Sequence, residues 1–121
     1  MAERRRILLV DDEPGMRDML WWSLERAGYD IVQAGDGVEA LARLEAGGVD
    51  LVITDLTMPR RGGLDLLRAL RERPGCPPVI VATGFGTVET AVEAMRLGAV
   101  DFLLKPFDYD RLIERVHACL T

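Results

Sequence analysis

Five short apolar runs alternate along the chain with longer segments in which apolar residues recur every three or four positions. The third run contains Leu51, Val52 and Ile53 without polar alternation, a pattern typical of a strand buried on both faces of a parallel sheet. The five runs cover residues 5–10, 29–34, 49–55, 79–82 and 99–104. We therefore expect five strands, each followed by an amphipathic helix.

The segments between the runs carry residues that start and stop helices. Pro14 suits the first turn of the first helix, and Asp36 and Asp108 can accept backbone N–H groups at the starts of the second and fifth. Gly28 and Gly98 end the first and fourth helices, because glycine readily adopts the conformation that closes a helix. The fourth helix carries one apolar stripe, composed of Val88, Ala91, Val92 and Met95.

Short connections between alternating strands and helices predict a parallel sheet covered by helices on both faces. The chain of 121 residues suffices for one hydrophobic core, so we expect one domain over residues 1–121. The expected fold is α/β, a flavodoxin-like doubly wound (βα)5 arrangement with strand order 2-1-3-4-5. In that order ligands bind outside the carboxyl ends of the strands, where the winding reverses between strands one and three.

Polar side chains follow the predicted strands at their carboxyl ends. They are Asp11 and Asp12 after the first strand, Asp55 after the third, Thr83 after the fourth and Lys105 after the fifth. Three carboxylates in contact repel one another unless a cation neutralises them. Mg²⁺ fits few protein oxygens and several waters better than Ca²⁺ does. The cluster thus predicts a magnesium site that shields an incoming phosphoryl group, whose oxygens the lysine and threonine stabilise.

Composition excludes several function classes. The formal net charge of −5 disfavours direct nucleic-acid binding, which needs an excess of Lys and Arg. No apolar stretch approaches membrane-spanning length, and the short run after Arg6 does not make a secretory signal, so we expect a cytoplasmic protein without a membrane partner. His117 is the only histidine, and Cys76 and Cys119 lie far apart in sequence, which disfavours a catalytic triad or zinc site.

Four short motifs together resemble the defining set of bacterial two-component response-regulator receiver domains, and the resemblance covers the whole chain. The motifs are Asp11-Asp12, Asp55 followed by Met58-Pro59, Ala82-Thr83-Gly84, and Lys105-Pro106. Each motif is weak alone, whereas four in this order are highly specific. The segments 93–99 and 101–107 are most similar to receivers of enhancer-binding transcriptional activators.

The resemblance implies that Asp55 attacks a phosphohistidine of a sensor histidine kinase and becomes an aspartyl phosphate. It also implies that Asp12 and Asp55 hold Mg²⁺ directly, together with the backbone carbonyl of Thr57, and that Asp11 contributes through water. Such a chain is a phosphoacceptor signalling domain rather than an enzyme, although it promotes its own phosphorylation and dephosphorylation.

The resemblance also implies a conformational switch. Lys105 would pair with the phosphoryl group, and Thr83 would move to bond it. Phe102 matches the aromatic switch position, whose ring turns inward once Thr83 is drawn toward the phosphate. Since phenylalanine lacks a hydroxyl, we expect packing alone to bias its ring. The peptide between Lys105 and Pro106 is expected to be cis.

The positions that receivers use to align the hydrolytic water carry Thr57 and Phe85, two residues after Asp55 and Thr83. Neither side chain is a carboxylate or an amide, and the ring can screen the phosphate. We therefore predict a long-lived acyl phosphate compared with receivers that carry acids or amides there.

Two surfaces are candidates for partners. If Leu20 and Leu24 face the core, Trp22 lies nearly opposite, toward solvent, with Trp21 at the boundary. Trp22 is then either a partner anchor, on a surface that similar receivers offer to the kinase, or one of the single exposed apolar residues that are common in proteins. The fourth helix and fifth strand adjoin the switch residues, so this region is the expected surface for an output domain or a homodimer.

Three alternative functions remain to be compared. Aspartate-nucleophile phosphatases need a second aspartate where Thr57 stands, and residues 84–89 lack the third glycine of a dinucleotide-binding loop. A receiver-like protein-interaction module that is never phosphorylated predicts a missing acid, lysine or threonine, yet Asp55, Lys105 and Thr83 are all present. Phosphoryl uptake from a small donor distinguishes this module from a phosphorylated receiver.

Overall fold

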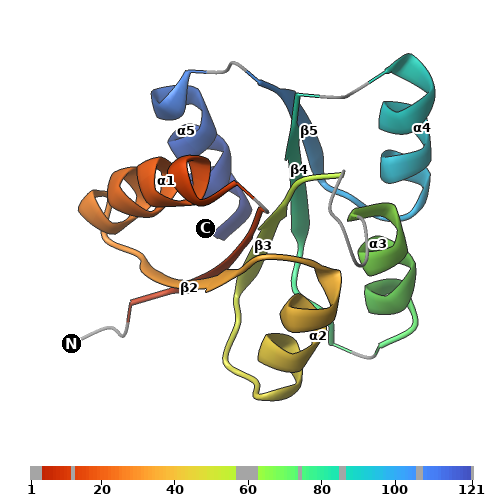
Figure 1. Cartoon of the computed structure of the whole chain (residues 1–121), viewed down its shortest axis with the longest axis horizontal. Helices are drawn as coiled ribbons and strands as arrows, with labels where there is room; N and C mark the ends of the chain where they lie inside the picture. Colours follow the sequence, from red (N-terminus) through yellow and green to blue (C-terminus); the bar gives the residue numbers. More distant parts are fainter. Residues whose placement is uncertain are drawn as a thin grey trace.

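The computed structural model describes residues 4–11, 13–56, 63–73, 75–84, 87–105 and 108–120. Five strands and five helices alternate along this described part. They are β1 Arg6–Val10, α1 Pro14–Arg26, β2 Asp30–Ala34, α2 Gly37–Glu45, β3 Leu51–Thr54, α3 Gly63–Arg71, β4 Val79–Thr83, α4 Val88–Arg96, β5 Asp101–Leu104 and α5 Tyr109–Leu120. All four strand pairings are parallel, in the order β2-β1-β3-β4-β5 (Figure 1). The predicted fold class is confirmed.

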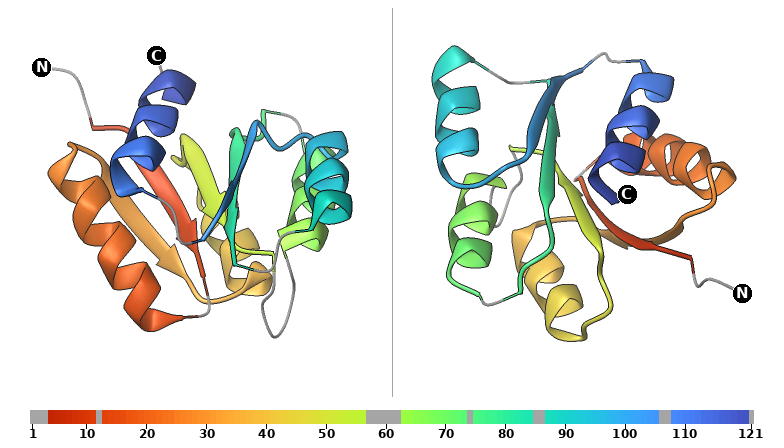
Figure 2. Two further views of the ribbon diagram at one scale, coloured as in Figure 1. Left: turned by 90° about the horizontal axis from the view of Figure 1, so that it is seen from above. Right: turned by 180° about the vertical axis from the view of Figure 1, so that it is seen from behind.

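The direction of winding reverses beside β1. Leu8 of β1 lies opposite Val32 of β2 on one side and Val52 of β3 on the other. Because crossovers are right-handed, the connection from β1 to β2 places its helix on one face and the later crossovers place theirs on the opposite face. Helices α1 and α5 accordingly cover one face, and α2, α3 and α4 cover the other (Figures 1 and 2).

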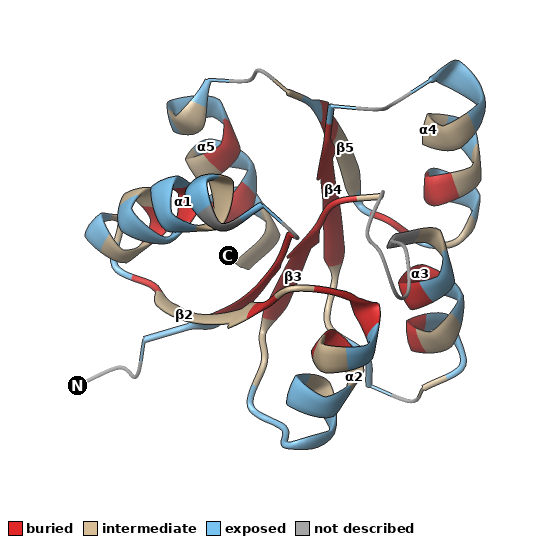
Figure 3. Ribbon diagram, in the orientation of Figure 1, coloured by how far each residue is buried: buried red, intermediate tan, exposed pale blue. Residues whose placement is uncertain are grey.

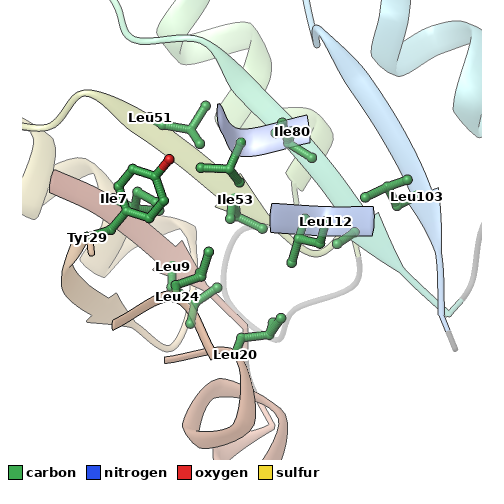
Figure 4. Close-up of a cluster of buried hydrophobic side chains, with 12 residues drawn as sticks. Ile7, Leu9, Leu20, Leu24, Tyr29, Leu51, Ile53, Ile80, Leu103 and Leu112 are labelled. Atoms are coloured by element: carbon green, nitrogen blue, oxygen red, sulfur yellow. The ribbon is translucent and has the colours of Figure 1, made fainter. Parts of the chain in front are cut away.

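Successive residues of the central strands enter two different hydrophobic clusters. Ile7 and Leu9 pack into the cluster under α1 and α5, whereas Leu8 and Val10 pack into the cluster under α2, α3 and α4. Figure 4 shows the first cluster, where leucines of α1 and α5 meet the strands. Each fully buried leucine or isoleucine contributes roughly 1.5–3 kcal/mol. Burial on both faces explains why these strands lack polar alternation.

The predicted helix starts are confirmed. Pro14 is the first residue of α1. Asp36 accepts a hydrogen bond from the backbone N–H of Glu39 at 2.9 Å, and Asp108 accepts one from the N–H of Asp110 at 2.9 Å. Among the helices that the structure describes, none is long and apolar enough to cross a membrane.

The apolar stripe of α4 faces solvent rather than the sheet. Val88, Val92 and Met95 are exposed, and the residue of α4 that is fully buried is Ala94 (Figure 3). Helix α4 lies over the edge strand β5, where a small side chain permits close packing. The larger apolar side chains therefore form an outward surface, which the sequence pattern alone did not show.

Candidate functional site

The hydrogen-bonding ladder of the sheet continues one residue beyond three strands and fixes the backbones of three polar residues. The N–H of Asp11 donates to the last residue of β2 at 3.1 Å, and the N–H of Asp55 donates to the last residue of β1 at 3.0 Å. The N–H of Lys105 donates to the last residue of β4 at 2.9 Å. All three residues therefore start from the carboxyl edge of the sheet, where ligands bind in this topology.

The side chain of Lys105 bridges the two aspartates. Its Nζ lies 2.7 Å from Oδ2 of Asp11 and 3.1 Å from Oδ2 of Asp55. Both aspartate side chains are 3% exposed, and that of Lys105 is 10% exposed. The convergence of these three residues, which was predicted from the ends of three separate strands, is confirmed.

Backbone N–H groups hold the other carboxylate oxygens. Oδ1 of Asp11 accepts from the N–H of Glu13 at 3.0 Å, and Oδ1 of Asp55 accepts from the N–H of Leu56 at 2.6 Å. Each carboxylate thus has one oxygen bound to the backbone and one bound to the ammonium group. These contacts fix the rotation of both groups and offset part of the cost of burying their charge.

The electrostatics of the site favour an additional cation. Burial alone lowers the pKa of Lys105, but the hydrogen bonds and negative charges of Asp11 and Asp55 outweigh it, so the pKa is raised above its usual value. The lysine therefore stays protonated at neutral pH. Two carboxylates and one ammonium group leave one net negative charge in a nearly buried site. The carboxylate oxygens are the hard ligands that Mg²⁺ prefers.

Thr83 and Phe102 occupy the same face of neighbouring strands. Thr83 is fully buried at the end of β4, and Phe102 is half-buried against the cluster under α2, α3 and α4. Phe102 of β5 lies opposite Val81 of β4. Thr83 follows Val81 by two residues along β4, so Thr83 and Phe102 face the same side of the sheet. The backbone arrangement is compatible with the predicted switch.

Several predicted residues lie outside the described part of the chain. They are Asp12, Thr57, Met58, Pro59, Phe85 and Pro106. Within the described residues, no group of three His, Cys, Asp or Glu side chains gathers that could hold a metal ion. The observed carboxylates, Asp11 and Asp55, fit Mg²⁺ in chemistry and charge, while the complete ligand set stays a prediction.

A sequence profile of the family described as response regulator receiver domain matches residues 7–117. This chain belongs to that family. The transcriptional regulatory protein FixJ of Bradyrhizobium diazoefficiens is 37% identical over 120 residues, which cover 99% of this chain and 58% of FixJ. The response regulator protein PilR of Pseudomonas aeruginosa is 39% identical over 117 residues, which cover 97% of this chain and 26% of PilR.

Solved receiver structures share the fold. The crystal structure of a response regulator receiver protein from Pseudomonas putida has a TM-score of 0.91 and 41% sequence identity, and the match covers 98% of this chain and 99% of that one. This chain therefore spans little more than half of the length of FixJ and about a quarter of the length of PilR. Receiver domains belong to two-component response regulators and are phosphorylated on an aspartate by sensor kinases. The relatives' names confirm the predicted similarity to transcriptional regulators.

Trp22 is exposed on α1 of the receiver domain, as predicted from the opposite position of Leu20 and Leu24. Trp22 is 54% exposed, and the guanidinium carbon of Arg26 lies 4.5 Å from the centroid of its ring. A surface groove of about 410 Å³ between α1 and α5 begins at these two residues and extends to Tyr109. Trp22 therefore lies at the edge of a concave surface rather than on a flat one.

One polar contact beside Asp55 was not predicted from the sequence. Thr54, the last residue of β3, is fully buried and donates its hydroxyl to the backbone carbonyl of Asp55 at 2.9 Å. The available signal was a hydroxyl residue at the end of an otherwise aliphatic run. Threonine is common in strands, so this signal alone did not separate a functional contact from β-propensity.

Proposed function

We propose that Asp55 is the residue of this receiver domain that accepts a phosphoryl group from a sensor histidine kinase, and that residues 1–121 form one such domain. The carrying observation is the bridge from Lys105 to Asp11 and Asp55. The bridge places the carboxylate of Asp55 beside the ammonium group that would pair with a transferred phosphoryl group. The position of Asp55 before Met58 and Pro59 supports the same assignment.

In the proposed reaction, a carboxylate oxygen of Asp55 attacks the phosphorus atom of a kinase phosphohistidine. A P–O bond forms while the P–N bond breaks, and the imidazole leaves with the electron pair of that bond. The Lys105 ammonium pairs with one phosphoryl oxygen, and the Thr83 hydroxyl donates a hydrogen bond to another. Hydrolysis later returns inorganic phosphate and the free carboxylate, so the domain promotes both its own phosphorylation and its dephosphorylation.

The residues proposed to hold Mg²⁺ are Asp11, Asp12, Asp55 and the backbone carbonyl of Thr57. When bound, the ion would supply positive charge that offsets the negative charge of the carboxylates and of the phosphoryl group. Support comes from the net negative charge that remains beside Lys105 and from the carboxylate oxygens at Asp11 and Asp55. A neutral or basic site at this edge would have contradicted the proposal.

The proposed output is a change of packing at Thr83 and Phe102. Once the Thr83 hydroxyl is drawn to the phosphoryl group, it vacates space on the face that Phe102 shares. The ring then turns inward, and the surface formed by α4 and β5 changes shape. Exposed Val88, Val92 and Leu104 make this surface apolar, which suits an output domain or a second copy of the chain. Trp22 is proposed to contact the kinase.

A small phosphodonor tests this function without any kinase. The protein is incubated with acetyl phosphate and Mg²⁺, and intact mass spectrometry measures the addition of one phosphoryl group. We expect uptake by the wild type, none by Asp55→Asn, and normal uptake by the control Asp65→Asn, which removes an exposed carboxylate from α3. Uptake by Asp55→Asn would refute the assignment. A wild type that takes up nothing would favour the unphosphorylated interaction module.

A further inference from the structure

The hydroxyl of Thr54 is unusual because it is fully buried at the end of an otherwise aliphatic strand and lies opposite valine on both neighbouring strands. Thr54 is fully buried, and its register partners are Val10 of β1 and Val81 of β4. Valine has nearly the same shape and would fit such a position without removing a hydroxyl from water. Packing alone therefore does not explain the hydroxyl.

One peptide group connects this hydroxyl to the carboxylate of Asp55. The Thr54 hydroxyl donates to the carbonyl oxygen of Asp55 at 2.9 Å. The N–H of Leu56 belongs to the same peptide group and donates to Oδ1 of Asp55 at 2.6 Å. Because a peptide group is planar and rigid, holding its carbonyl oxygen also fixes the direction of its N–H.

We propose that Thr54 is a positioning residue for phosphoryl transfer, acting through the peptide group between Asp55 and Leu56. That peptide binds Oδ1 of Asp55 and thereby turns Oδ2 toward Lys105, which lies 3.1 Å away. Thr54 itself does not touch the phosphoryl group. The inference rests on the proposed role of Asp55, since a fixed carboxylate speeds transfer only where that carboxylate is the nucleophile.

Two substitutions separate the hydroxyl from the shape of the side chain. Thr54→Val keeps the branched shape and removes the hydroxyl, whereas Thr54→Ser keeps the hydroxyl and removes a methyl group. The initial rate of phosphorylation is measured against acetyl phosphate concentration at saturating Mg²⁺. We expect Thr54→Val to lower kcat about fivefold with little change in KM, as for one lost neutral hydrogen bond, and Thr54→Ser to stay within about twofold of the wild type.

A second readout reports on the peptide group itself and needs no phosphorylation. In ¹H–¹⁵N spectra, the Leu56 amide proton should lie downfield in the wild type and in Thr54→Ser, and it should shift upfield in Thr54→Val. Denaturant unfolding measures the stability of each variant. If Thr54 served only in packing, Thr54→Ser would lose the most stability, because the missing methyl group leaves a cavity.

The outcomes distinguish this inference from the proposed function. A Thr54→Val variant with a wild-type rate and an unmoved Leu56 resonance would overturn the inference while leaving Asp55 as phosphoacceptor. Equal rate losses in Thr54→Val and Thr54→Ser would also overturn it, because packing would then be the cause. Absence of phosphorylation in the wild type would instead refute the proposed function.

Discussion

Lys105 Nζ lies 2.7 Å from Oδ2 of Asp11, and this ion pair connects the end of the edge strand β5 to the end of the interior strand β1. Lys105 is the only lysine of the chain. Its ammonium group also contacts Asp55, so one cation neutralises part of the charge of two nearly buried carboxylates. The charge balance of the site therefore depends on one side chain that can be replaced cleanly.

Replacing Lys105 with methionine should have opposite effects on magnesium binding and on phosphoryl transfer. Mg²⁺ should bind more tightly, because Asp11 and Asp55 lose their shared counter-charge. Phosphorylation by acetyl phosphate should slow at least about tenfold, because the ammonium no longer stabilises the phosphoryl oxygens. Calorimetric titration with Mg²⁺ measures the first effect, and Arg111→Met, which removes an exposed cation from α5, is the control. Weaker Mg²⁺ binding in Lys105→Met would contradict the charge argument.

The titration of Lys105 gives a prediction about pH. Burial lowers its pKa, but Asp11 and Asp55 raise it further, to above the usual value. Because the folded-state pKa of Lys105 lies above the unfolded value of about 10.4, the ion pair stabilises the fold fully at pH values below about 10.4. This contribution is lost as the pH rises through the folded-state pKa. NMR titration of ¹³C-labelled lysine observes this side chain without overlap. The midpoint should fall in Asp11→Asn and stay unchanged in Asp65→Asn.

The lifetime of the acyl phosphate is a prediction from sequence alone, because Thr57 and Phe85 lie outside the described residues. Neither side chain can orient a hydrolytic water as an acid or amide does. We expect slow loss of phosphate from the purified, phosphorylated protein in Mg²⁺, and about tenfold faster loss in Thr57→Asn. Mass spectrometry after removal of the donor measures both rates. A half-life of seconds in the wild type would show the prediction to be wrong.

The main features of the site were predictable because the topology determines where strand ends meet. Asp11, Asp55 and Lys105 each follow an apolar run, and the carboxyl ends of parallel strands share one edge. That one lysine would bridge both aspartates was not predictable. Such a bridge depends on side-chain torsions and on burial depth, and neither is encoded in the spacing of residues.

Orientation on the surface was harder to predict than position in the core. The stripe containing Val88, Val92 and Met95 resembles a buried helix face, yet it points to solvent because Ala94 makes the close contact. For α1 the predicted orientation is confirmed, since Leu20 and Leu24 are large and both lie in the core. Periodicity identifies an apolar face, whereas tertiary packing decides whether that face is covered.

Trp22 should matter for phosphorylation by the kinase and not for phosphorylation by a small donor. Its ring lies under Arg26 at the edge of the groove between α1 and α5, and aromatic anchors of this kind contribute much of the energy at protein interfaces. Trp22→Ala should slow phosphotransfer from the sensor kinase about tenfold and leave acetyl phosphate labelling unchanged. Val88→Ala, which shortens an exposed side chain on α4, is the control. Equal slowing with both phosphodonors would indicate a folding defect instead.

The exposed apolar residues of α4 and β5 predict association after phosphorylation. Five of the nine large apolar residues that are exposed in the described part of the chain lie on α4, on β5 or in the turn between them. We expect the phosphorylated protein to form a dimer in sedimentation velocity experiments, and Met95→Glu to keep it monomeric by placing a charge in the interface. Met19→Glu is a matched control, because Met19 is 53% exposed on α1 and Met95 is 47% exposed. Dimers that persist in Met95→Glu but not in Met19→Glu would place the interface on α1. If the phosphorylated wild type stays monomeric at all concentrations, the apolar surface would have to serve a different protein, and Met95→Glu should then weaken binding to the output domain.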